Sequence, residues 1–307
     1  MPDTQPVIDT PAQIKLVEEI FKDTNLCKVK VLASLTKGLE GSSLSPMAEL
    51  KQAGAIALTN CLNPIKDPLV LRRAMEYATG QDITIFYQPQ NNYLANNGCV
   101  HEGKISGKLG LPGIPSAAES VAVAEAILLS KLTNSRLHLC RVSCLESLML
   151  IQNAQSEGLS VTSDVAIHQL FFDESSIDNF NSDFHVMPPF RSNEDLVALH
   201  QAVKKETITA ICSDHQPHNE DAKQAPFSDT QPGISSIELL LPLLMELVEL
   251  KIIDMSVAIA KVTSNPSEIL GIDAGVIAKG LPADLCIIKK EAWLFDEAKI
   301  LSSGKNN

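Results

Sequence analysis

Residues 213–218, Ser-Asp-His-Gln-Pro-His, combine the side-chain types that a hydrolytic site needs. They follow the apolar run 208–212, which predicts a strand that ends in a loop. A carboxylate at the end of a strand, with imidazoles one and four residues later, can help to hold an activated water and move its proton. Such segments lie at the mouth of parallel barrels. We therefore interpret Asp214 as the centre of a candidate metal-assisted hydrolase site.

Strands and helices that could position this segment alternate along the chain. The predicted strands are 29–33, 55–59, 83–87, 136–140, 159–162 and 208–212. The predicted helices are those beginning near 11, 45, 68, 117, 143 and 192, with two or three more between 233 and 270. This alternation predicts βα units and a parallel sheet.

A (β/α)8 barrel needs eight strands, and only six full strands precede the helical part of the chain. Because the first helix has no strand before it, we expect a TIM barrel whose N-terminal strand or strands are missing, and therefore a fragment that is poorly soluble alone. An open doubly wound sheet is the alternative. No glycine-rich phosphate loop of the G-x-G-x-x-G or Walker type supports that alternative.

Two further regions differ from this alternation. The stretch 91–115 is rich in Asn and Gly and predicts a long functional loop, either an active-site loop or an interaction surface. Residues 275–277 and 284–288 predict short strands of a separate β element. We therefore expect an incomplete barrel over 1–272 and part of a small β-sandwich over 273–307.

Composition excludes several classes of function. A net charge of -12 in 307 residues disfavours nucleic acid and anionic membrane as partners. The apolar stretch 237–250 contains three glutamates and is too short to span a bilayer. Seven cysteines without a C-x-x-C pair indicate reduced thiols and a cytoplasmic protein rather than a thiolate zinc site.

Five segments, in order over essentially the whole chain, have a recognisable pattern. They are MPDTQPVID at 1–9, GLPGIP at 110–115 followed by Glu119, PPFR at 188–191, SDHQPH at 213–218, and GVIAKGLPADL at 275–285. Together they resemble the dihydroorotase family of the amidohydrolase superfamily. The resemblance implies a TIM barrel that hydrolyses a cyclic amide in pyrimidine synthesis, with a zinc-bound hydroxide as the nucleophile. It makes Asp214 the catalytic proton shuttle, and His218 and Asp3 substrate-binding residues.

The same resemblance implies metal ligands that this chain lacks. The family's H-x-H pair would precede the first motif, and no H-x-H occurs in these residues. The positions matching three further ligands are Asn60, Gln88 and Arg141, so only Asp214 remains. Amides are poor zinc ligands and a guanidinium repels a cation. We therefore predict no metal and no cofactor, with Arg141 paired to Asp214.

Two functions remain open. The first is a non-catalytic, oligomeric dihydroorotase-like protein that acts as a structural partner of the aspartate carbamoyltransferase catalytic chain. The alternative is an active dihydroorotase or related cyclic-amide hydrolase that uses one zinc on an upstream H-x-H and Asp214. In either case dihydroorotate is the implied small-molecule ligand. Among the other histidines, His138 is expected in the core and His215 in a structural role, and no role is assigned to His101, His168, His185 and His200.

Overall fold

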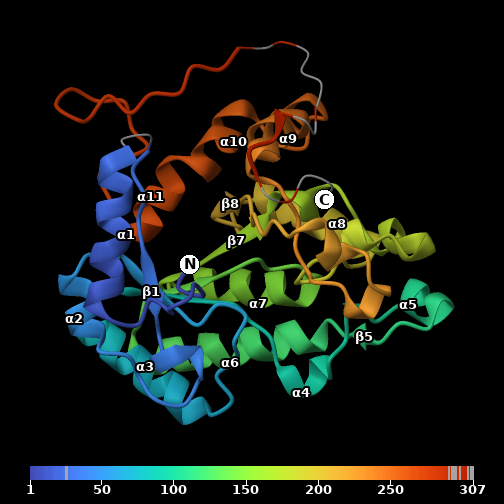
Figure 1. Ribbon diagram of the computed structural model, residues 1–307, viewed down its shortest axis with the longest axis horizontal. Coiled ribbons are helices and arrows are strands. Elements are labelled where there is room, and N and C mark those ends of the chain that lie inside the picture. The colour runs from blue at the N-terminus through green and yellow to red at the C-terminus, as the bar shows by residue number, and fades with distance from the viewer. Residues whose placement is uncertain (25–26, 290, 292–295, 297–298, 303, 305–307) are drawn as a thin grey trace.

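The computed structural model describes residues 1–24, 27–289, 291, 296, 299–302 and 304. Six strands form one parallel sheet in the order β1-β2-β3-β6-β7-β8 (Figure 1). The strands are β1 (Leu32–Ser34), β2 (Ala57–Thr59), β3 (Thr84–Tyr87), β6 (Leu137–Leu139), β7 (Val161–Ala166) and β8 (Ala210–Cys212). Because neighbouring strands are all parallel, their carboxyl ends meet along one edge of the sheet.

Helices connect successive strands, as expected for βα units. The helices are α1 (Pro11–Thr24), α2 (Met47–Gln52), α3 (Pro68–Gly80), α6 (Ala117–Thr133), α7 (Leu145–Ser156), α8 (Asn193–Lys204), α9 (Leu240–Glu249), α10 (Met255–Val262) and α11 (Ser264–Leu270). Helices α3, α6 and α7 pack side by side (Figure 1). Their buried residues and the strands form one large apolar core.

Helix α3 illustrates why the sequence folds in this way. The Asp67 side chain caps its first turn by accepting a hydrogen bond from the Leu69 backbone at 2.8 Å, and Pro68 occupies the first helical position. Leu71 and Met75, one turn apart, are buried against the sheet. Burying a side chain of this size stabilises the fold by about 1.5–3 kcal/mol.

The long loop predicted over 91–115 contains regular structure of its own. Two short helices, α4 (Asn92–Ala95) and α5 (Lys104–Leu109), alternate with the two-stranded parallel pair β4 (Val100–His101) and β5 (Gly113–Ile114). The pair is too short to show the apolar alternation of a strand in the sequence. Strand β7 also begins later and runs further than the predicted 159–162.

The strands predicted at 275–277 and 284–288 are not formed in the part of the chain that the structure describes. Ile277 and Ile287 are 89% and 95% exposed, so no neighbouring strand covers them. The alternating apolar pattern is a strand signal only where a sheet can bury one face. The division into a barrel ending at 272 and a β-sandwich part beginning at 273 stays a prediction. Part of 289–307 lies outside the described residues.

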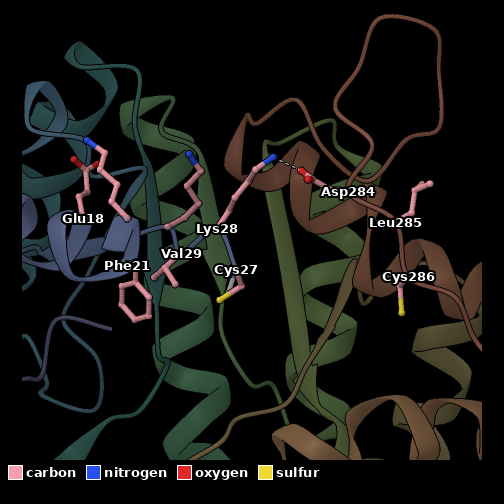
Figure 2. Close-up of a pocket in the computed structure, with 10 residues that line it drawn as sticks. Glu18, Phe21, Cys27, Lys28, Val29, Asp284, Leu285 and Cys286 are labelled. Atoms are coloured by element: carbon pink, nitrogen blue, oxygen red, sulfur yellow. Dashed lines mark hydrogen bonds and ion pairs between the residues drawn. The ribbon is translucent and has the colours of Figure 1, made fainter. Parts of the chain in front are cut away.

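The C-terminal segment lies near the N-terminal helix. An open pocket of about 930 Å³ separates α1 from residues 284–286, and Figure 2 shows the ion pair between Lys28 and Asp284 beside it. Both partners of this pair are mostly exposed, so it contributes little stability. Among the described residues, no helix has the length and apolar character needed to cross a membrane.

Candidate functional site

Three polar residues occupy equivalent places at the carboxyl ends of adjacent strands. Arg141, His168 and Asp214 each lie two residues beyond the last residue of β6, β7 and β8. Because these strands are parallel neighbours, the three side chains converge at one edge of the sheet. Arg141 and Asp214 have positive φ angles of 52° and 48°, a conformation that is uncommon outside glycine and recurs at functional sites.

Arg141 and Asp214 form a buried ion pair, which confirms the predicted pairing. Arg141 Nη1 donates to Asp214 Oδ1 at 2.7 Å, and the two side chains are 7% and 8% exposed. Arg141 Nε donates to Gln88 Oε1 at 2.7 Å, and Gln216 Nε2 donates to the same Asp214 oxygen at 2.8 Å. Burial opposes the charge on Arg141, but Asp214, together with the nearby Cys140 and Cys212, outweighs burial and raises the pKa of the guanidinium.

The positions that match the family's metal ligands are therefore bound to the chain itself. Asn60 accepts a hydrogen bond from Thr36 Oγ1 at 2.6 Å and donates to the Asn63 carbonyl at 2.9 Å. Gln88 and Asp214 are held by Arg141, whose fixed positive charge repels a cation. The residues at these positions do not fit a zinc ion.

The prediction that the chain has no cofactor is nevertheless wrong, because the structure brings a different ligand set together. One ligand atom each from His138, Cys140 and Asp164 lie within 4.8 Å of one another, and all three residues are buried. Imidazole, thiolate and carboxylate are the ligands that zinc takes in proteins. The sequence signal was a His-x-Cys pair that spans the end of β6, with both side chains expected on the same face. The lack of a C-x-x-C pair does not exclude a site of this kind.

Hydrogen bonds and burial set the charges in this cluster. His138 Nε2 contacts Asp164 Oδ2 at 2.8 Å, and the Arg141 backbone N–H donates to Asp164 Oδ1 at 2.7 Å. Burial opposes the charge of Asp164, but His138 and Arg141 together outweigh burial and hold the pKa of the carboxyl below its usual value. Burial raises the pKa of the Cys140 thiol well above its usual value. Without a metal, the cluster is therefore a hydrogen-bonded His138–Asp164 pair beside a protonated Cys140 thiol.

His168 is a site residue that sequence reasoning missed. It is 2% exposed, and neither ring nitrogen has a hydrogen-bond partner among the described residues. Its imidazole lies within electrostatic range of Asp214 and Arg141, and burial lowers its pKa to about 4. The signal that could have found it is its place just after a strand, which it shares with Asp214.

The two predicted substrate-binding residues have partners other than the ion pair. His218 Nε2 donates to the Pro232 carbonyl at 3.0 Å, and Asp3 is exposed beside the Cys61 thiol. Burial, and then the Asp3 carboxylate, raise the pKa of this thiol to about 12. Among the described residues, no hydrogen bond or ion pair joins Asp3 or His218 to Asp214, and their substrate role stays a prediction.

His215 has the structural role expected of it. Its Nδ1 accepts hydrogen bonds from the backbone N–H groups of Ser236 and Ile237 at 3.1 and 3.3 Å. These bonds tie the segment after β8 to the start of the α9 region, so this imidazole is occupied as a structural acceptor.

Two of the sequence motifs form a buried network near the site. The Glu119 carboxylate accepts from the Ser143 and Cys144 backbone at 2.9 and 3.3 Å, just before α7 begins. Arg191 lies 3.7 Å from Glu119 and donates to the Ile114 carbonyl at 2.8 Å. The network joins the segments 110–119 and 188–191 and holds the loop that follows Arg141.

Comparisons with known proteins assign the family. A family profile described as Dihydro-orotase-like matches residues 1–147. A protein named dihydroorotase-like protein from Pseudomonas putida is 41% identical over 305 residues, which cover 99% of this chain and 72% of that protein. A dihydroorotase from Geotalea daltonii is 35% identical over 308 residues, with 100% of this chain and 72% of the relative covered.

The chain belongs to the dihydroorotase family. An L-hydantoinase structure from Arthrobacter aurescens matches this dihydroorotase-family chain with a TM-score of 0.79 at 19% identity, covering 92% of this chain and 65% of that one. This likeness concerns the fold, and it confirms the TIM-barrel fold class expected from the sequence. Both the family and the fold class predicted from the sequence are confirmed.

Proposed function

We propose that this dihydroorotase-like protein of pyrimidine metabolism does not hydrolyse dihydroorotate and acts as a structural partner of the aspartate carbamoyltransferase catalytic chain. The observation that carries the proposal is the buried Arg141–Asp214 ion pair with Gln88 bound to the same guanidinium. Three positions that the family resemblance assigns to metal ligands are thereby linked to one another.

The ion pair conflicts with the proton shuttle that the resemblance assigns to Asp214. A general base must reach the proton that it moves, directly or through one water. Here the Oδ1 atom of Asp214 accepts from both Arg141 and Gln216, and the carboxylate is almost fully buried. Freeing it would leave the Arg141 charge buried without its partner, which costs about 3–5 kcal/mol.

Family motifs that shape the loops, rather than take part in hydrolysis, form their contacts in this chain. The Glu119–Arg191 network holds the loops around the strand ends. A scaffold needs these loops in fixed positions but needs no free catalytic carboxylate. All seven cysteines are free thiols in the described structure, which supports a reducing compartment such as the cytoplasm.

One observation favours an active hydrolase as the second candidate. The unpartnered imidazole of His168 lies near Asp214, and buried polar atoms without partners are often functional. In that case the site would open Arg141 away from Asp214 when substrate binds, and Asp214 would then receive the proton.

Co-expression with a tagged aspartate carbamoyltransferase catalytic chain tests the proposal. We expect a complex of defined stoichiometry on size exclusion, with the same stoichiometry for the wild type and for the folded fraction of Asp214→Asn, because the partner role does not use this carboxylate. The control is Lys131→Met, a surface change remote from the site. Absence of a complex for the wild type, together with hydrolysis of dihydroorotate, would favour the second candidate.

A further inference from the structure

A second set of polar residues lies beside the ion pair, on β6 and β7. His138 lies opposite Thr162 in the pairing of β6 with β7, and the same register continued past Leu139 puts Cys140 opposite Asp164. These side chains share one face of the sheet because side chains alternate along a strand. The resemblance to dihydroorotases assigns none of His138, Cys140 and Asp164 to a metal.

The spacing of the donor atoms suits a tetrahedral ion. Zinc bonds of about 2.1 Å to nitrogen or oxygen and about 2.3 Å to sulfur place the donors roughly 3.3–3.8 Å apart. His138 Nε2 and Asp164 Oδ2 are 2.8 Å apart, and the three donors lie within 4.8 Å of one another. Shifts of the donor atoms by about 1 Å or less would therefore bring their separations to those around a bound ion.

His138 has the outer partner that a metal-bound histidine needs. Its Nδ1 lies 2.8 Å from Thr162 Oγ1, and a hydroxyl can either donate or accept. Without metal, the hydroxyl donates to Nδ1 while Nε2–H donates to Asp164. With metal on Nε2, the proton moves to Nδ1 and is donated to the same hydroxyl, so no partner is lost.

Cys212, at the end of β8, contacts the same carboxylate through its other oxygen. Its Sγ donates to Asp164 Oδ1 at 3.4 Å, while His138 contacts Oδ2, so Cys212 is not part of the cluster of three donors. The Cys140 thiolate and the Asp164 carboxylate would neutralise a divalent cation. The charge of Arg141 nearby is already balanced by Asp214.

We infer that His138, Cys140 and Asp164 form a three-ligand, zinc-type metal site that is separate from the positions matching the family's ligands. Binding releases the Cys140 thiol proton to solvent, and no bond is oxidised or reduced. The ion would tie the end of β6 to β7. Three protein ligands leave the fourth position of a tetrahedral ion to water.

The test is to express the full chain with cobalt in place of zinc and to record its absorption spectrum and metal content. We expect about one metal per chain, a near-ultraviolet thiolate-to-cobalt band and the visible bands of a tetrahedral ion. Cys140→Ser should remove the thiolate band and the bound metal. Cys99→Ser, a buried cysteine that is hydrogen-bonded to Pro112 in the 91–115 region, is the matched control and should leave both unchanged.

Thr162→Val tests the outer partner with a variant that keeps every ligand. We expect metal affinity to fall about 10–100-fold, the usual effect of removing such a hydrogen bond. A wild-type chain that takes up no cobalt, or a cobalt spectrum that Cys140→Ser leaves unchanged, would overturn the inference. Both readouts are independent of hydrolysis and of the carbamoyltransferase, so their failure would leave the proposed function untouched.

Discussion

The strongest stability prediction concerns the buried Arg141–Asp214 pair. Arg141→Met leaves the Asp214 carboxylate buried with Gln216 as its one remaining side-chain donor in the described part of the chain, and it also removes the donor to Gln88. Breaking such a pair costs about 3–5 kcal/mol. The Gln88 bond adds about 1 kcal/mol. Asp214→Asn leaves the guanidinium without a counter-charge and should cost about 3 kcal/mol by the same reasoning.

The double variant Arg141→Met/Asp214→Asn separates pairing from the loss of each side chain. With no charge left buried, it should be more stable than the sum of the single changes predicts, by at least about 2 kcal/mol. Urea unfolding followed by circular dichroism, with each variant's own m-value, gives the four free energies.

A surface pair provides the matched control for this cycle. Lys131 and Glu157 are joined at 2.6 Å, but their side chains are 56% and 55% exposed. Lys131→Met and Glu157→Gln should each cost no more than about 1 kcal/mol, with coupling below that value. If Arg141→Met cost no more than Lys131→Met, the ion pair would not hold the site as described.

Three further predictions concern stability. Because burial lowers the pKa of His168 to about 4, below its unfolded value, the unfolded metal-free chain binds more protons and stability should fall as the pH drops from 6.5 to 4. His168→Leu should remove about one proton from that dependence in urea titrations; an unchanged slope would show that this imidazole is not buried neutral. Glu119→Gln should cost about 2–3 kcal/mol, since the buried carboxylate receives charge-assisted hydrogen bonds, and a midpoint equal to the wild type in thermal unfolding would contradict this. Leu71→Ala should cost about 2–5 kcal/mol, while the exposed Leu69→Ala should stay within about 0.5 kcal/mol; equal effects would refute the assigned face of α3.

The order of strands and helices could be predicted because each strand is a short buried apolar run with a helix after it. The strand ending at Cys212 and the helix beginning after Asp67 are examples. The predicted C-terminal strands are not formed among the described residues, because an apolar pattern such as that around Ile287 forms a strand only beside another strand. In the described structure this segment is exposed, and the pattern alone carries no information on its neighbours.

The candidate site was predicted in part. Pairing between Arg141 and Asp214 followed from the residue types at matched positions, and the structure confirms it. The cluster around Asp164 could not be predicted, since its three members come from two strands and become close only through the register of β6 and β7. His168 was missed because a single histidine has no spacing partner in the sequence. That its ring nitrogens are buried without hydrogen-bond partners among the described residues is evident only from the structure.

The most direct test of the central claim is dihydroorotate hydrolysis by the purified wild-type chain with zinc supplied and metal content measured on the same sample. We predict no turnover above the buffer rate, whether or not zinc is bound, because Asp214 is held by Arg141 and Gln216. Turnover by the wild type that is abolished in Asp214→Asn would show that this carboxylate shuttles a proton, and would contradict the account.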